Sequence, residues 1–217
     1  MTTLDNQLLS QQLHAQFDEA RSSFAFELSQ EQQHKLIDFV LLLHKWNKAY
    51  NLSSVRQPDQ MLIKHIFDSL VVSPYLNGAL FADVGTGPGL PGIPLAIMNP
   101  TKSFHLIDSL GKRIRFIKQA VHELNITNVT PIQARVEQVP VEQVYDGVLS
   151  RAFASLDDML QWCAHLTDKK GQFLALKGQL HKDELKQIPS QFKLVQSIPL
   201  LIPSLQGERH LVVLAKN

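Results

Sequence analysis

The stretch Asp83-Val84-Gly85-Thr86-Gly87-Pro88-Gly89-Leu90-Pro91-Gly92 decides the fold of this 217-residue chain. It continues from an apolar run that predicts a β-strand over residues 80–84, and it precedes a segment that predicts a helix. Glycines at alternate positions allow backbone conformations that a Cβ blocks, and they let the main chain approach a ligand closely. In an open α/β sheet, the turn after the first strand faces the crevice where nucleotides bind. The stretch therefore predicts a site for a nucleotide-like ligand at this turn.

Strands and helices alternate along the chain after this turn. Apolar runs predict further strands at residues 104–108, 129–133, 145–149, 172–176, 192–198 and 209–215. Amphipathic segments predict helices at residues 110–124, 154–166 and 180–187. Such alternation implies parallel strand pairing and right-handed crossovers. We therefore expect an α/β fold with a doubly wound sheet.

The first 75 residues have a helical rhythm instead. The signals are Leu9, Leu13 and Phe17 at four-residue spacing, the capping-box pair Ser29 and Gln32, and Pro58 followed by an apolar stripe at Leu62, Ile66 and Leu70. Pro74 ends the third predicted helix. We expect residues 1–75 to form a helical N-terminal extension that packs as one unit with a ligand-binding domain over residues 76–217.

Composition and charge limit the class of protein. Hydrophobic residues make up 44% of the chain, which is enough for a sizeable core. The longest strongly apolar run, residues 39–43, is far shorter than the roughly 20 residues of a membrane span, and the first residues lack a secretory-signal pattern. The one cysteine, Cys163, forms no internal disulfide. We expect a cytoplasmic protein without a membrane partner, and at a net charge of +1 a nucleic acid would need a local basic patch.

Two features of the turn favour S-adenosylmethionine over a dinucleotide as the ligand. The glycines also satisfy the G-x-G-x-x-G pattern of dinucleotide binders, but that match alone is weak. Asp83 stands two residues before the first glycine, where an acid can reach the ammonium group of a methionine moiety. Pro88, Pro91 and Pro94 remove backbone donors that a pyrophosphate would need, whereas S-adenosylmethionine has no phosphate.

Asp108 supplies a second acidic anchor for the same ligand. It ends the second predicted strand, where a carboxylate can accept hydrogen bonds from both ribose hydroxyls of an adenosine. We therefore expect Asp83, Gly85, Gly87, Gly89 and Asp108 to hold the cofactor.

Several motifs then resemble those of one family, the bacterial 16S ribosomal RNA guanine-N7 methyltransferases, also called glucose-inhibited division protein B. The motifs are HKWNKAYNLSSVR (44–56), HIFDSL (65–70), DVGTGPGLPGIPLAI (83–97), LIDSLGKRIRFI (106–117), SRAFASL (150–156), ALKG (175–178) and GERHLVV (207–213). The resemblance covers nearly the whole chain from about residue 28. Residues 52–54 read Leu-Ser-Ser where the family often has Leu-Thr, and both versions carry a hydroxyl group.

The resemblance implies a class I methyltransferase fold with a seven-stranded sheet, in which the last hairpin inserts one antiparallel strand. It implies methylation of N7 of one guanine in 16S RNA, with S-adenosylhomocysteine as the product. The substrate would be the small ribosomal subunit or an assembly intermediate, and no stable protein partner is expected. Carried over by position, the cofactor contacts fall at Gly85, Leu90, Val136, Glu137 and Arg151.

The residue types present fit this reaction. Cys163 lies inside a predicted apolar helix, so we expect it to be buried and not to act as the nucleophile that carbon methylation needs. The loop Ser150-Arg151-Ala152-Phe153 lacks the Asn/Asp-Pro-Pro-Tyr motif of amino-group methylation. Guanine N7 already carries a lone pair, so its methylation needs mainly alignment. No catalytic base is identified, and Arg151 is expected to orient the methionine carboxylate or the target base, or else to form a salt bridge elsewhere.

Basic residues are candidates for an RNA-binding rim, although each alone could be a solvated surface charge. The candidates are Lys45, Lys48, Arg56, Lys64, Lys112, Arg113, Arg115 and Lys177. Trp46, Tyr50 and Phe153 could stack on a flipped base, but Trp46 fits core packing better. His65 and Asp68 share a helix face, and without a third ligand they predict a polar tie between the extension and the sheet; no metal is expected.

Three other functions stay open at this point. One is a methyltransferase of small molecules or proteins, which would have the same crevice without a basic rim. Another is a non-catalytic ribosomal-RNA-binding assembly factor, which would show no affinity for the cofactor. The third is a nicotinamide-dependent oxidoreductase.

Overall fold

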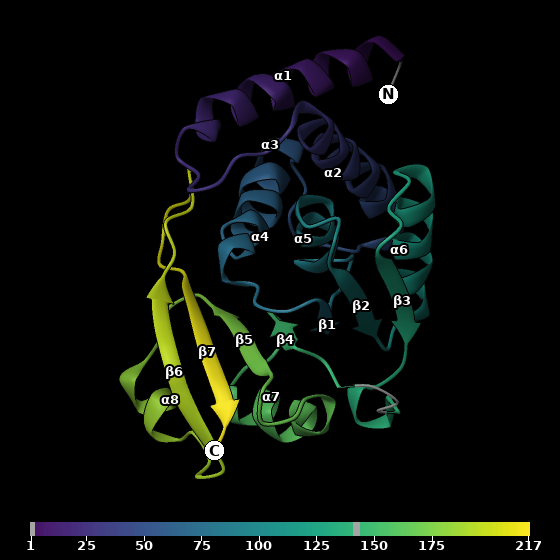
Figure 1. Ribbon diagram of the computed structural model, residues 1–217. Helices are drawn as coiled ribbons and strands as arrows, with labels where there is room; N and C mark the ends of the chain where they lie inside the picture. The colour runs from purple at the N-terminus through teal and green to yellow at the C-terminus, as the bar shows by residue number, and fades with distance from the viewer. Residues whose placement is uncertain (1–2, 141–143) are drawn as a thin grey trace.

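The computed structural model of the protein describes residues 3–140 and 144–217 (Figure 1). A seven-stranded sheet forms its centre, in the order β3-β2-β1-β4-β5-β7-β6. The strands are β1 (Leu80–Val84), β2 (Ser103–Asp108), β3 (Val129–Gln133), β4 (Gly147–Ser150), β5 (Gln172–Lys177), β6 (Phe192–Pro199) and β7 (His210–Lys216). Strand β7 runs antiparallel between β5 and β6, whereas β1 to β5 pair in parallel. The predicted doubly wound sheet with one antiparallel inserted strand is confirmed.

Helices cover both faces of the sheet (Figure 1). The regular helices are α1 (Thr3–Arg21), α2 (Gln30–Tyr50), α3 (Pro58–Met61), α4 (Asp68–Leu70), α5 (Gly92–Met98), α6 (Gly111–Glu123), α7 (Leu156–Cys163) and α8 (Lys182–Lys186). Single turns of other helix types lie at Leu62–Phe67, Ser73–Tyr75, Val136–Gln138 and Ala164–Leu166. None of the helices in the described part of the chain is long and apolar enough to cross a membrane.

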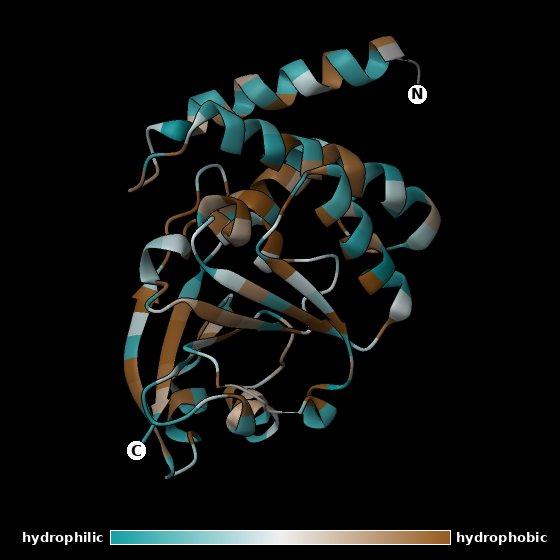
Figure 2. Cartoon of the chain, turned by 45° about the vertical axis from the view of Figure 1, so that its right-hand side comes forward, coloured by the Kyte–Doolittle hydropathy of each residue, from teal (hydrophilic) through white to brown (hydrophobic). Residues whose placement is uncertain are grey.

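Alternation along the strands separates two hydrophobic clusters. In β4, Leu149 belongs to the cluster beneath α2, α5 and α6, whereas Val148 belongs to the cluster beneath α7. The first cluster also contains Leu13 and Phe17 of α1, so one core includes the N-terminal helices and one face of the sheet. In Figure 2 the outermost helix α1 is largely hydrophilic, and the hydrophobic colour gathers in the helices beneath it and in the strands.

A capping box begins α2, as the sequence predicts. The Ser29 hydroxyl accepts a hydrogen bond from the Gln32 amide, and the Gln32 side chain accepts one from the Ser29 amide. The side-chain nitrogen of Gln32 also donates to the carbonyl groups of Ile97 and Met98 at the end of α5. One residue therefore both starts the helix and fixes it to the sheet domain.

The third predicted helix differs from the expected regular one. Between α3 and α4 the backbone forms a π-helical turn over Leu62–Phe67. Every residue from Met61 to Leu70 is buried except Lys64, so the helix has no solvent face opposite the predicted apolar stripe. The predicted apolar stripe at Leu62, Ile66 and Leu70 is buried, and its neighbours are buried too because this segment is enclosed by α1 and α2 on one side and by the sheet domain on the other.

The predicted ends of two elements also shift. Strand β4 starts at Gly147 and not at residue 145, because the Asp146 carboxylate accepts hydrogen bonds from the amides of Ala79 and Leu80 before the ladder begins. Helix α7 starts at Leu156, where Ser155 caps it by accepting a hydrogen bond from the Asp158 amide.

The outer strand β6 is irregular. Its pairing with β7 shifts register between Leu194 and Gln196, which marks a β-bulge. Leu194 and Val195 at this bulge are exposed.

Candidate functional site

The glycine-rich turn after β1 lies at the carboxyl ends of β1 and β2. Gly85, Gly87 and Gly89 adopt left-handed backbone angles, with φ of 67°, 61° and 91°. The amides of Gly85 and Thr86 both donate to the Ile107 carbonyl at the end of β2. A Cβ on Gly85 would lie 2.5 Å from the Cβ of Ala152, so this glycine is needed for close packing against the loop after β4.

The Asp83 carboxylate stabilises the turn through hydrogen bonds. Its Oδ2 accepts hydrogen bonds from the Thr86 hydroxyl at 2.6 Å and from the Gly92 amide at 2.8 Å. The side chain is fully buried, and burial raises the pKa of its carboxyl group to about 6. The other oxygen, Oδ1, is buried without a hydrogen-bond partner. Oδ1 is therefore the acceptor that the predicted contact with a methionine ammonium group would use.

Asp108 ends β2 with most of its acceptor capacity already in use. Oδ1 accepts the Leu110 amide at 2.9 Å, whereas Oδ2 accepts the Gly87 amide and Nη1 of Arg113, both at 3.0 Å. A carboxylate can accept about four hydrogen bonds, so one position remains on Oδ1. The expected pair of ribose hydroxyls fits only if Arg113 moves away from Oδ2.

A cleft of about 530 Å³, here called the apolar cleft, opens beside this carboxylate. It is lined by Val84, Gly85, Ile107, Asp108, Ser109, Arg113, Ala134, Arg135, Val136, Glu137, Ala152, Phe153, Ala154, Asp158 and Trp162. The rings of Phe153 and Trp162 meet edge to face with centroids 5.8 Å apart. Flat apolar walls beside three carboxylates suit a nucleoside, whose base is apolar on its faces and whose ribose donates hydrogen bonds.

A second hollow of about 710 Å³, here called the basic hollow, adjoins the first. Its charged lining residues are Lys64, Arg113, Arg151, Lys177, Arg209 and Asp68, which are five cations and one carboxylate. The two hollows share Gly85, Arg113 and Ala152. A ligand in the apolar cleft can therefore meet a ligand in the basic hollow beside the glycine-rich turn.

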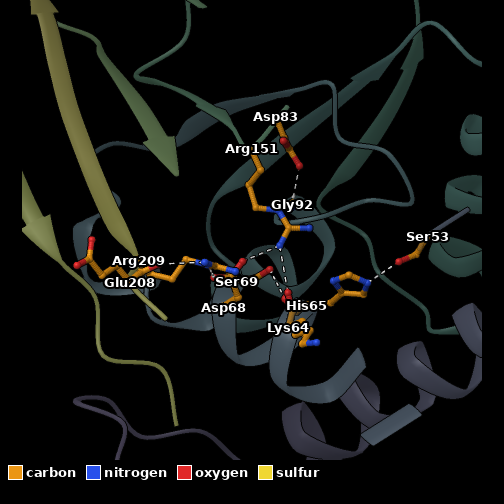
Figure 3. A network of polar contacts seen from close by, with 10 residues as sticks. All are labelled: Ser53, Lys64, His65, Asp68, Ser69, Asp83, Gly92, Arg151, Glu208 and Arg209. Atoms are coloured by element: carbon orange, nitrogen blue, oxygen red, sulfur yellow. Dashed lines mark hydrogen bonds and ion pairs between the residues drawn. The ribbon is translucent and has the colours of Figure 1, made fainter. Parts of the chain in front are cut away.

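Asp68 connects three parts of the chain at the basic hollow (Figure 3). Its Oδ2 lies 2.8 Å from Nη1 of Arg151, which follows β4, and its Oδ1 lies 2.9 Å from Nε of Arg209, which precedes β7. Beside it, Nε2 of His65 lies 2.7 Å from the Ser53 hydroxyl. Burial and the Arg151 charge lower the pKa of His65 to about 4. The predicted polar tie between the helical extension and the sheet is confirmed for Asp68, whereas His65 bonds within the extension.

The structure divides the predicted cofactor residues between the two hollows. The apolar cleft receives Gly85, Asp108, Val136 and Glu137, whereas the basic hollow receives Gly85, Gly87, Leu90 and Arg151. Asp83 and Gly89 line neither hollow. A Cβ on Gly89 would meet the Ile93 side chain, so this glycine serves the packing of α5. The cofactor roles of all nine residues stay predictions.

The eight basic rim candidates do not gather at one place. Lys64, Arg113 and Lys177 line the basic hollow, but Arg113 is paired with Asp108. Lys177 is largely buried, since its ammonium group binds Glu184 at 2.8 Å and the Ala154 carbonyl at 2.8 Å. Lys177 therefore fixes the loop after β4, a structural role that the rim hypothesis did not include.

The other five candidates lie elsewhere. Lys45 and Lys48 line a separate groove with residues of α1 and α6. Arg56 donates to the Asn47 carbonyl and to the Asn51 side chain, and Lys112 donates to the Tyr50 carbonyl. Arg115 is exposed on α6. The contacts of Arg56 and Lys112 order the loop after α2.

Two side-chain interpretations from the sequence are confirmed. Trp46 packs against the core, with its ring stacked on Tyr50 at 5.0 Å and edge-on to Phe116 at 5.7 Å. Cys163 is buried, and burial together with the Glu137 charge raises the pKa of its thiol to about 12. A thiol with this pKa is not the nucleophile of carbon methylation.

Arg209, Asp158 and Trp162 were missed as lining residues. Arg209 belongs to the motif GERHLVV, so its position in a shared motif was the available signal. Asp158 and Trp162 lie one turn apart on α7. The amphipathic pattern of this helix predicts that they lie outside the core, but not that they line a cleft.

Comparison with known proteins adds the family. The family model described as rRNA small subunit methyltransferase G (GidB) matches residues 32–212. The chain belongs to this family. A member from Photobacterium profundum is 61% identical over 188 residues, which is 87% of this chain and 91% of the relative. A member from Escherichia fergusonii is 58% identical over 190 residues, 88% of this chain and 92% of the relative. Both carry the name ribosomal RNA small subunit methyltransferase G.

Solved structures support the class I methyltransferase fold. TrmK of M. capricolum, determined with S-adenosylhomocysteine, superimposes with a TM-score of 0.54 at 15% identity over 70% of this chain and 68% of TrmK. TrmN from Thermus thermophilus gives 0.54 at 18% identity over 69% of this chain and 48% of TrmN. These likenesses concern the fold alone. Membership of the family decides against the nicotinamide-dependent oxidoreductase.

Proposed function

We propose that this protein uses S-adenosylmethionine to methylate N7 of one guanine in the 16S RNA of the small ribosomal subunit. The observation that carries the proposal is the junction of the two hollows at Gly85, Arg113 and Ala152. One hollow suits a nucleoside cofactor and the other an anionic polymer. The name of the close relatives supports ribosomal RNA of the small subunit as the substrate.

The residues of the apolar cleft fit S-adenosylmethionine. A volume of about 530 Å³ lies in the usual range for sites that enclose small ligands. Ile107, Val136 and the edge-to-face aromatic pair offer apolar contacts for an adenine. Asp108 offers the ribose one free acceptor position on Oδ1, and a second if Arg113 moves away. Asp83 lines neither hollow, but its buried Oδ1 lacks a donor, and a methionine ammonium group would provide one if the glycine-rich turn opened to it. When bound, the cofactor supplies an electrophilic methyl group on a sulfonium centre.

The residues of the basic hollow fit RNA. Arg113 and Lys177 are paired with Asp108 and Glu184, but three further cations face one carboxylate in this hollow. Their surplus positive charge attracts phosphate groups, and the attraction should weaken as salt rises. Lys64 is exposed there, and Arg151 and Arg209 are each partly exposed. A base that enters this hollow meets the apolar cleft at the glycine-rich turn.

The protein's part in the reaction is alignment. The N7 lone pair of guanine lies in the plane of the ring and attacks without loss of a proton, so no general base is required. Arg151, held by Asp68, orients the methionine carboxylate or the target base. The buried thiol of Cys163 leaves ring carbons without a nucleophilic catalyst in this site. The products are a cationic 7-methylguanine and S-adenosylhomocysteine.

The substrate is the small subunit or an assembly intermediate in the cytoplasm, and we propose no stable protein partner. The test uses purified protein, methyl-labelled cofactor and small subunits from cells that lack this gene. Label should appear in 16S RNA, and digestion should yield 7-methylguanosine at one position. Label in protein only, or at another atom, would contradict the proposal, whereas RNA binding without cofactor binding would favour an assembly factor.

A further inference from the structure

The basic hollow contains a carboxylate that aligns two guanidinium groups. Asp68 stands on α4, Arg151 follows β4 and Arg209 precedes β7, so the three residues come from distant parts of the chain (Figure 3). The Asp68 side chain is only 6% exposed, whereas those of Arg151 and Arg209 are 23% and 31% exposed. The carboxylate is thus buried beneath two cations that reach the hollow.

The recorded contacts leave donors on both arginines. Asp68 engages Nη1 of Arg151 and Nε of Arg209. Nη1 of Arg209 also donates to the Glu208 carbonyl, and Nη1 of Arg151 lies 3.5 Å from the Lys64 carbonyl. A guanidinium group has five N–H donors in a planar fork, so in the part of the chain described here Nη2 of each arginine remains for a ligand.

The local charge favours an anion. Lys64, Arg151 and Arg209 carry three positive charges against the one negative charge of Asp68. The Glu208 carboxylate points away from the cluster (Figure 3). His65 at the same place stays neutral, because its pKa lies well below 7. The free edge of the Arg209 guanidinium group, with surplus positive charge around it, matches the geometry of a phosphate group better than a lysine would.

We propose that Arg209, aligned by Asp68 in the basic hollow, binds a phosphodiester group of the RNA next to the target nucleotide. This inference rests on the proposed function, because it assumes that RNA enters the basic hollow. It assigns Arg209 a phosphate-binding role and makes Asp68 a positioning residue. A phosphate fixed at this place would set the distance of the flipped base from the glycine-rich turn.

The test measures binding of unmethylated small subunits over a range of salt concentrations. Arg209→Ala should weaken binding about tenfold. It should also make the negative slope of log affinity against log salt less steep by roughly one. Lys186→Ala is the matched control, because Lys186 lies on α8 in an exposed ion pair with Asp183 and should leave the slope unchanged. Arg209→Lys keeps the charge but loses the fork, so it should keep the slope and still bind more weakly.

Calorimetry with S-adenosylhomocysteine separates the sources of the anion. Arg209 does not line the apolar cleft, so its variants should bind this ligand as the unchanged protein does. A loss of that affinity would assign the site to the cofactor carboxylate and overturn the inference. If the unchanged protein binds and methylates RNA but Arg209→Ala keeps its slope and affinity, only this inference fails. If the unchanged protein does neither, the proposed function fails.

Discussion

Nη1 of Arg113 lies 3.0 Å from Oδ2 of Asp108, on the same oxygen that accepts the Gly87 amide. Arg113 also lines both hollows, and its Nε is buried without a partner. An unpaired buried donor costs free energy, so this arginine is not in its most favourable environment. The contact therefore links the carboxylate expected to hold the ribose to the surface expected to hold RNA.

Asp108→Asn should weaken binding of S-adenosylhomocysteine by 10- to 100-fold. The asparagine lacks the charge that strengthens the ribose contact, which weakens the binding free energy by about 1.5–3 kcal/mol. Its NH₂ group also faces the N–H donor of either Gly87 or Leu110, where the carboxylate oxygen accepted a hydrogen bond. Calorimetry on folded protein measures the effect. Asp183→Asn, in an exposed ion pair on α8, is the control. An undiminished affinity in folded Asp108→Asn would remove this residue from the site.

Gly87→Ala and Gly85→Ala should differ in stability. Both residues have positive φ, which costs an alanine about 1–2 kcal/mol, but an added Cβ at Gly87 meets nothing within 4 Å. At Gly85 it overlaps Ala152, which adds about 1–3 kcal/mol of overpacking. Urea unfolding compares the two variants. Equal losses would show that Ala152 moves aside freely.

Trp162 should report cofactor binding by fluorescence. Its ring lines the apolar cleft and is 48% exposed, so a nucleoside placed there changes its surroundings. The chain has one other tryptophan, Trp46, which packs on Tyr50 and Phe116 away from the cleft lining. Titration with S-adenosylhomocysteine should change the emission of Trp46→Phe and leave that of Trp162→Phe constant. The reverse pattern would place the ligand elsewhere.

His65 should make folding sensitive to acid. Its folded pKa of about 4 lies below the unfolded value of 6.5, so the unfolded chain binds the proton more readily. The stability contribution is complete above pH 6.5 and is lost as the pH falls toward 4. From pH 7 to pH 5, the free energy of unfolding should fall by about 2 kcal/mol more in the unchanged protein than in His65→Gln.

Asp83 acts in the opposite direction over the same pH range. Its folded pKa of about 6 lies above the ordinary aspartate value of 3.8, so its protonation favours the folded state as the pH falls. The difference between His65→Gln and the unchanged protein isolates the histidine, since both contain Asp83. Parallel pH profiles of the two proteins would contradict the assignment of a neutral, buried His65.

Local patterns predicted the elements but not their long-range contacts. The strand before the glycine-rich turn was predicted residue for residue, and α6 shortened by only one residue at each end, because their apolar periods are regular. The π-helical turn over Leu62–Phe67 left no such mark, since it depends on helices packed around it. Sequence periodicity predicts which single face of a helix is buried, whereas this segment is buried on nearly all sides.

The site shows the same limit. The sequence indicated that Gly85 leaves space for a ligand. Its close packing against Ala152 follows only from the pairing of β4 with β1. Lys177 was predicted as a surface cation, because the sequence does not show that the fold brings Glu184 into an ion pair with it. The family resemblance implied that the last hairpin inserts one antiparallel strand, but the sequence did not show which of the two terminal runs pairs with β5, and so where Arg209 lies.

The bulge in β6 bears on how this molecule behaves at high concentration. An outer strand with a flat, regular edge offers its free amides and carbonyls to another copy of the chain. In β6 the shifted register at Leu194 and Gln196, the charge of Lys193 and the ring of Pro199 interrupt that edge. The strand is therefore a poor template for edge-to-edge aggregation, even though it carries exposed leucine and valine side chains.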